Sequence, residues 1–161
     1  MHALTTFPPP RLRFPHVLMG GAAVGTFDLA FACTWWAIAA GVPPIRIFQS
    51  IGSGLLGEAS FEGGLRSAAL GGVAHYLIAT CMVLAYALVA TRLPALVRQP
   101  WRWGALYGLF LYGFMNFVVV PLSAAAGPSK FRLGWVLASI AVHVVIGIAA
   151  AFFSRRSIRV L

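Results

Sequence analysis

Residues 132–153 read RLGWVLASIAVHVVIGIAAAFF, a run in which only Ser139 and His143 interrupt the apolar and small residues that follow Arg132. An α-helix rises 1.5 Å per residue, so about 20 apolar residues cross the hydrocarbon core of a bilayer. Three other runs have the same length and character, at 17–40, 67–90 and 103–125. The sequence therefore predicts an all-α membrane protein with four transmembrane helices in an up-down bundle.

The composition of the chain supports the same class. Of its 161 residues, 60% are hydrophobic and 9% are charged, whereas a soluble domain carries about 25% charged residues. The net charge is +9, and the cations lie at the edges of the apolar runs. This distribution favours membrane lipids, including anionic headgroups, as partners and argues against nucleic acid.

The segments outside the spans are short. Residues 1–16 are predicted to form a proline-rich arm, 17–153 the bundle, and 154–161 a basic tail. At 100° per residue, apolar and polar side chains of 45–57 fall on opposite arcs, which predicts a short amphipathic helix in the membrane interface between the first two spans. No connection is long enough for a separate soluble domain.

The cations also predict the orientation, because arginine and lysine are enriched in short cytoplasmic loops. With the N-terminus inside, four cations face outward: Arg46, Arg66, Lys130 and Arg132. Eight then face the cytoplasm: Arg11, Arg13, Arg92, Arg98, Arg102, Arg155, Arg156 and Arg159. Both termini are therefore predicted to be cytoplasmic.

Asp28, His75 and His143 fall inside the predicted spans, where ionisable groups are costly and mark candidate functional sites. Asp28 and His143 lie near the helix centres, Asn116 about 3 Å further out and His75 about 6 Å further out, at 1.5 Å per residue. Each shares a helical stripe with small residues. The stripes are Gly21-Gly25-Asp28-Ala32, Ala68-Gly71-His75-Ala79, Gly104-Gly108-Tyr112-Asn116 and Ser139-His143-Gly147-Ala151.

Small-residue stripes are where membrane helices pack closely, so these side chains are predicted to form one polar layer inside the bundle. The layer includes Tyr112 as well as the four polar residues. In a simple up-down bundle the first span lies beside the second or fourth, so His75 and His143 are the expected neighbours of Asp28, ahead of Asn116. The layer is open to three interpretations: interhelical hydrogen bonding, a small-molecule, quinone or proton site, or haem ligation by the two histidines.

The outer connection holds a second set of candidates. Arg46 and Gln49 lie on the polar arc of the interfacial helix, and Glu58 and Glu62 follow it four residues apart. Two carboxylates alone make a poor divalent-cation site without further oxygen ligands, so a solvated or arginine-paired face is expected. The sequence predicts no metal site and no catalytic residues, because it contains none of the common catalytic motifs.

Several short tracts resemble the small YagU-like inner-membrane proteins of bacteria. The tracts are Trp36-Ala37 through Gly41-Val42-Pro43-Pro44, the histidine-bearing second span, Arg102-Trp103-Gly104-Ala105 with Pro121-Leu122, and the His143 helix running into Arg155-Arg156. Residues 46–57 depart from that pattern. The resemblance implies a bacterial inner (plasma) membrane location and a four-span architecture, and it implies no site residues.

The leading interpretation is a non-enzymatic membrane protein, either an accessory subunit of a larger membrane complex or a self-associating bundle. Four small-residue stripes offer more close-packing surface than one bundle obviously needs. The first alternative is a proton-linked small-molecule or quinone binding or transport protein that uses Asp28, His75 and His143. The second is a b-type haem protein; no other cofactor is predicted.

Overall fold

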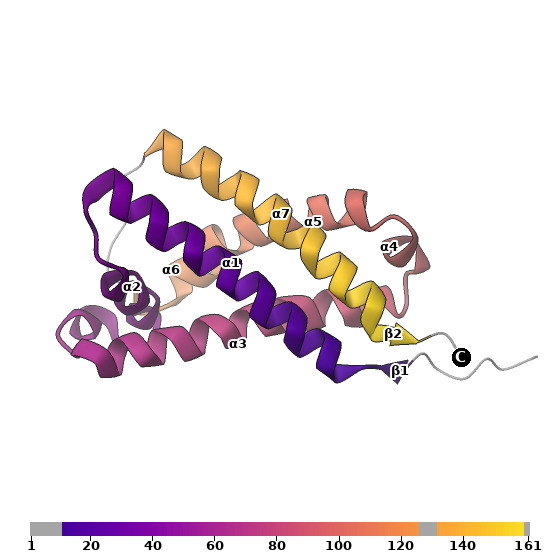
Figure 1. Ribbon diagram of the computed structural model, residues 1–161, viewed down its shortest axis with the longest axis horizontal. Coiled ribbons are helices and arrows are strands. Elements are labelled where there is room, and N and C mark those ends of the chain that lie inside the picture. The colour runs from indigo at the N-terminus through magenta and orange to yellow at the C-terminus, as the bar shows by residue number, and fades with distance from the viewer. Residues whose placement is uncertain (1–10, 126–131, 160–161) are drawn as a thin grey trace, which may run out of the picture.

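The computed structural model describes residues 11–125 and 132–159, and in them it confirms an all-α membrane protein (Figure 1). Four helices are long and apolar enough to cross a membrane, so the chain is a multi-pass integral membrane protein. In chain order the elements are β1 (Arg11–Leu12), α1 (Phe14–Ala40), α2 (Pro44–Leu56), the 3-10 turn η1 (Gly57–Phe61), α3 (Gly64–Ala90), α4 (Pro94–Arg98), α5 (Pro100–Phe114), the π-helix η2 (Met115–Val119), α6 (Val120–Leu122), α7 (Leu133–Ser157) and β2 (Ile158–Arg159).

The spans alternate in direction along the bundle (Figure 1). The two-residue strands β1 and β2 pair antiparallel, with Leu12 opposite Ile158. The backbone of Arg13 also donates a hydrogen bond to the Ser157 carbonyl. These contacts hold the start of α1 and the end of α7 at the same end of the bundle.

The helix boundaries differ from the predicted ones at the ends. Helix α1 begins at Phe14 rather than at 17, because Pro15 occupies the first turn, where the missing N–H has no intrahelical partner to lose. Helix α7 continues to Ser157, through the first half of the predicted basic tail. Pro8, Pro9 and Pro10 of the predicted arm lie outside the described residues.

The third span is not the uniform helix predicted over 103–125. It begins at Pro100, widens into η2 over Met115–Val119 and ends at Leu122. Pro121 has no N–H to donate to a carbonyl one turn earlier, and such gaps in the backbone ladder are commonly relieved by wider turns. The span still has the length and apolar character to cross a bilayer.

Helix α7 is central to the packing, since it contacts α1, α3 and α5, while α1 also packs on α3. Glycines permit the closest approach. A Cβ added at Gly104 would lie 2.7 Å from the Cα of Ile148, and one at Gly108 would lie 2.7 Å from the Cα of Val144. Valine, leucine and alanine side chains fill the rest of the core around Val17, Val83 and Ile146.

Helix α2 lies across the end of the bundle opposite β1 and β2, and Figure 1 shows it nearly end-on beside α1 and α3. Its polar residues Gln49 and Ser53 are buried, whereas Leu55 and Leu56 are exposed. This arrangement suits an interfacial helix, because the apolar side chains face outward and the polar ones are satisfied within the protein.

Candidate functional site

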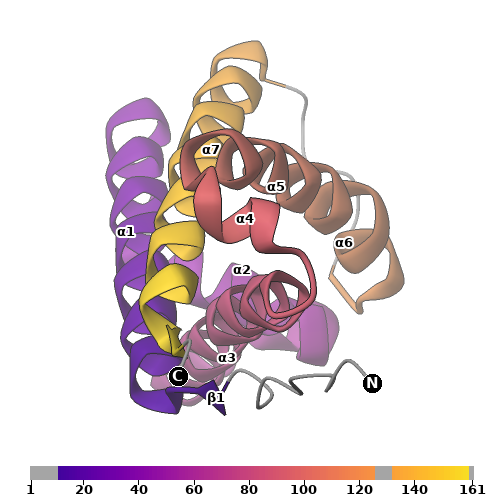
Figure 2. The same ribbon diagram turned by 90° about the vertical axis from the view of Figure 1, so that its right-hand side faces the viewer.

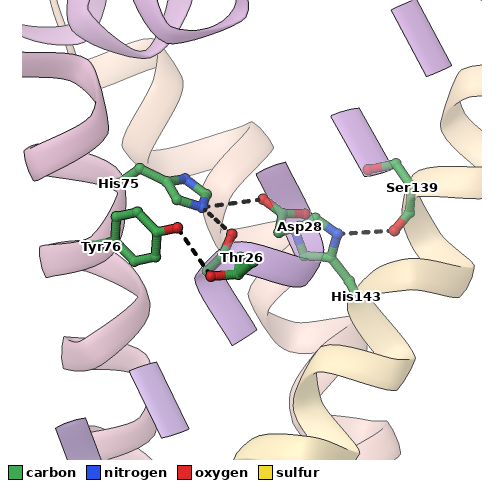
Figure 3. Close-up of polar contacts among 7 residues, drawn as sticks. Thr26, Asp28, His75, Tyr76, Ser139 and His143 are labelled. Atoms are coloured by element: carbon green, nitrogen blue, oxygen red, sulfur yellow. Dashed lines mark hydrogen bonds and ion pairs between the residues drawn. The ribbon is translucent and has the colours of Figure 1, made fainter. Parts of the chain in front are cut away.

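The structure brings Asp28 of α1 close to His75 of α3. The Asp28 Oδ2 atom lies 3.9 Å from the His75 Nε2 atom, and the two side chains are 30% and 14% exposed. His75 Nε2 also lies 3.0 Å from the Gly25 carbonyl oxygen, one turn before Asp28 (Figure 3). One imidazole nitrogen therefore faces both a backbone carbonyl and a carboxylate of the neighbouring helix.

Glycine makes this approach of α1 to α3 possible. A Cβ added at Gly21 would lie 2.7 Å from the Cα of Thr80, and one at Gly25 would lie 2.9 Å from Cδ1 of Tyr76. The predicted offset of about 6 Å in depth between Asp28 and His75 does not keep them apart, because the two helices are inclined to each other (Figure 1).

The hydrogen bond to Gly25 determines which ring nitrogen of His75 carries a proton. A carbonyl oxygen only accepts, so Nε2 is the donor and Nδ1 carries the lone pair in the neutral ring. The carboxylate of Asp28 lies beyond hydrogen-bond distance of the same nitrogen.

Thr26 and Tyr76 form a second link between α1 and α3, which the sequence analysis missed. Their hydroxyl oxygens lie 3.0 Å apart (Figure 3). Each neighbours a predicted site residue along the chain, since Thr26 precedes Asp28 by two positions and Tyr76 follows His75. This closeness along the chain is the only sequence feature that could have identified Thr26 and Tyr76 as site residues, because neither lies on the small-residue stripe of its helix.

His143 of α7 makes a different contact. Its Nδ1 atom donates to the Ser139 carbonyl of its own helix at 2.8 Å, and its ring packs edge-on against Tyr112 of α5 with centroids 5.5 Å apart. In Figure 3 the Asp28 carboxylate lies between the α3 and α7 histidines. Because Nδ1 is the donor, the lone pair of a neutral His143 is on Nε2.

Asn116 is not part of an interhelical contact in the described residues. Its side-chain amide donates to the Tyr112 carbonyl one turn earlier at 2.8 Å, and the residue is exposed within η2. The predicted layer thus divides into an interhelical pair, Asp28 with His75, and a group in which His143 and Asn116 each bond to their own helix.

The outer candidates have structural contacts. Gln49 is 3% exposed and donates to the Gly64 carbonyl at 3.2 Å. Arg46 donates to the Gln49 side chain at 3.2 Å and to the Phe61 carbonyl at 2.9 Å. Glu58 and Glu62 are exposed, and no arginine of the described residues lies within 4.0 Å of either carboxylate. Arg46 and Gln49 therefore fasten α2 to the start of α3.

Within residues 11–125 and 132–159, no three histidine, cysteine, aspartate or glutamate side chains come together as a metal site would require. Comparison of the chain with protein-family models, curated proteins and solved structures finds no match. The candidate site is therefore defined by its own chemistry. It combines one carboxylate, one imidazole and two hydroxyls between two membrane-spanning helices, and it can bind a proton or a small hydrogen-bonding ligand.

Proposed function

We propose that this protein is a non-enzymatic membrane protein that couples protons to the binding or transport of a small molecule at Asp28 and His75. The observation that carries the proposal is the 3.9 Å approach of these two side chains between α1 and α3. Ionisable residues inside membrane spans are costly to keep and commonly mark proton or substrate pathways.

The surroundings support proton exchange at the pair. Asp28 retains 30% exposure, so its carboxylate is not sealed in the core. The Thr26 and Tyr76 hydroxyls lie between the same two helices. His143 adds a second imidazole on α7, which packs on both α1 and α3, and its Nε2 lone pair is not used by the bond to Ser139.

Proton flux into reconstituted vesicles tests this proposal. Vesicles that contain a pH-sensitive dye and a potassium-set membrane potential should acidify when they carry the wild-type protein. Asp28→Asn and His75→Gln should abolish the flux, whereas His16→Gln, the same imidazole-to-amide change near the start of α1, should retain it. Flux that persists in Asp28→Asn, or that is absent from the wild type, would contradict a proton pathway through Asp28 and His75.

A second candidate is the accessory or self-associating role, and the exposure of α5 favours it. This helix packs mainly on α7, and Leu106, Phe110 and Phe114 are 55%, 58% and 41% exposed. The small-residue stripes no longer favour it, because the glycines of the four stripes all make close contacts within the chain. Mass measurement in mild detergent tests this role, and a monomer without a copurifying partner would count against it.

The haem alternative has weaker geometric support. His75 Nε2 is occupied by the Gly25 carbonyl and His143 Nδ1 by the Ser139 carbonyl, so each imidazole offers one nitrogen to an iron. An absorption spectrum distinguishes the readings. A Soret band that disappears in both His75→Ala and His143→Ala would favour haem over the proton site.

We also propose a bacterial inner membrane location with both termini in the cytoplasm, which the resemblance to YagU-like proteins and the arginine distribution support. Single cysteines introduced at Glu62 and Arg92, in a background without Cys33 and Cys81, test the orientation. Glu62→Cys should react with an impermeant reagent from outside intact cells, and Arg92→Cys only after permeabilisation. The reverse pattern would invert the topology.

A further inference from the structure

An apolar groove of about 390 Å³ lies at the end of the bundle that carries β1 and β2, away from the Asp28 pair. Figure 2, which faces this end, shows α4 between α3 and α5. The groove is lined by residues of all three helices, chiefly Ala85, Val89, Leu96, Trp103, Leu106 and Phe110.

The two tyrosines of the groove, Tyr86 and Tyr107, have their hydroxyls satisfied by backbone carbonyls. Tyr107 donates to the Met82 carbonyl at 2.8 Å, and Tyr86 donates to the Leu96 carbonyl at 3.1 Å. Their rings meet edge-on with centroids 5.1 Å apart and form part of the apolar wall. A ligand in the groove would therefore meet hydrocarbon surface rather than hydrogen-bonding groups.

The groove is open on the side that faces the hydrocarbon of the membrane. Val89 on α3 is 50% exposed, and Leu106 and Phe110 on α5 are 55% and 58% exposed. Each of these residues lies in a helix long enough to span the bilayer. A lipid acyl chain can thus enter sideways, without leaving the membrane.

Three arginines lie close to groove residues along the chain: Arg92 is three positions after Val89, Arg98 two after Leu96, and Arg102 directly before Trp103. Arg92 follows α3, Arg98 ends α4, and Arg102 lies in the first turn of α5. All three are exposed, and none lies within 4.0 Å of a carboxylate of the described residues. The acidic residues of the described chain lie mid-span at Asp28 or at the opposite end at Glu58 and Glu62.

We propose that this groove binds an anionic phospholipid, with one acyl chain against the apolar wall and the phosphate at Arg92, Arg98 and Arg102. Guanidinium groups bind phosphate oxygens in bidentate fashion, and basic pockets between membrane helices bind anionic headgroups. The three arginines suit the negatively charged headgroup of such a lipid, and the apolar lining of the groove suits its acyl chain. This site is separate from the proposed proton site.

Native mass spectrometry of the purified full chain, titrated with phosphatidylglycerol or phosphatidylcholine, tests the proposal. The triple variant Arg92→Gln/Arg98→Gln/Arg102→Gln should bind phosphatidylglycerol at least about tenfold more weakly. The matched control Arg13→Gln/Arg155→Gln/Arg156→Gln removes the same charge from exposed positions at the same end. It should change the affinity by less than about twofold.

A groove-filling variant, Ala85→Phe, tests the acyl-chain part while all the arginines remain. It should also weaken phosphatidylglycerol binding about tenfold, with helix content by circular dichroism unchanged from wild type. Equal losses in the two arginine triples would indicate diffuse attraction to the surface and overturn the proposal. Unchanged phosphatidylglycerol binding in Ala85→Phe would also overturn the proposal. So would a wild-type dimer that Ala85→Phe converts to monomers, because the groove would then bind a second copy of the chain.

Discussion

The polar side chains in the two halves of the layer find their partners in opposite ways. Between α1 and α3, His75 reaches the neighbouring helix and meets Gly25 and Asp28. Between α5 and α7, His143 and Asn116 each bond to a carbonyl one turn back on their own helix. The first half therefore links two helices through polar groups, and the second does not.

The difference shows that a small-residue stripe predicts closeness of backbones but not the direction of a polar side chain. Gly108 and Gly147 bring α5 and α7 as close as Gly21 and Gly25 bring α1 and α3. In the α5–α7 pair, backbone contact leaves His143 to bond to its own helix. Backbone packing should therefore account for most of the stability of the α5–α7 pair. In the α1–α3 pair, the polar contact of His75 should contribute measurably to stability.

The largest expected effect is on the α5–α7 packing. Gly108→Val should lower the free energy of unfolding by about 3 kcal/mol, because its Cβ would meet the His143 and Val144 backbone and overpacking strains both helices. Gly113→Val is the matched control, since a Cβ at Gly113 meets nothing within 4 Å. Unfolding in mixed detergent micelles measures both. Equal losses would mean that the close approach of α5 to α7 does not stabilise the fold.

A pair of identical substitutions compares the two histidines directly. His75→Phe should destabilise the protein by about 1.5 kcal/mol, because it removes an interhelical hydrogen bond and leaves Asp28 without its nearest partner. His143→Phe keeps the aromatic contact with Tyr112 and should cost less than about 0.5 kcal/mol, since only a bond within one helix is lost. The same unfolding assay checks them. A larger loss in His143→Phe would reverse the contrast between the halves.

A double-mutant cycle isolates the Asp28 pairing. Asp28→Asn combined with His75→Gln should show a coupling energy of about 1 kcal/mol, in the range of interactions between membrane helices. Asp28→Asn combined with His143→Gln should show coupling below about 0.3 kcal/mol, within the additivity expected of independent sites. Coupling of equal size in both cycles would indicate one continuous layer rather than two separate halves.

The smallest effect is expected at Asn116. Asn116→Leu should change the free energy of unfolding by less than about 0.5 kcal/mol, because the amide is exposed and bonds only to its own helix. Val118→Leu, another exposed position of η2, provides the baseline for a change of side chain there. A loss of more than about 1 kcal/mol in Asn116→Leu alone would point to an interhelical role for the amide.

Much of the fold could be predicted from hydropathy. The four spans and the interfacial helix lie where the apolar runs and the amphipathic arc indicate, with ends displaced by a few residues. The displacements follow local chemistry that a hydropathy run does not report, such as Pro15 in a first turn. The π-helix over Met115–Val119 was not predicted, because it depends on how the backbone accommodates Pro121 within a packed helix.

The site was predictable only in part. The cost of charge in hydrocarbon singled out Asp28, His75 and His143, and the glycine stripes indicated which helix faces would meet. Neither signal predicts the side-chain conformation of His75 or the hydrogen bond between the hydroxyls of Thr26 and Tyr76. Those contacts depend on the inclination of α1 to α3, which sets the relative depth of side chains on two different helices.

By itself, the sequence determined that this is a four-span membrane protein, because a bilayer demands about 20 apolar residues per crossing whatever the helices pack against. Only the tertiary structure decided that Asp28 meets His75 while His143 bonds to Ser139, and that α3, α4 and α5 together line an apolar groove. Span length is a property of one segment. Side-chain partners and grooves depend on the rotation, tilt and depth of several helices together.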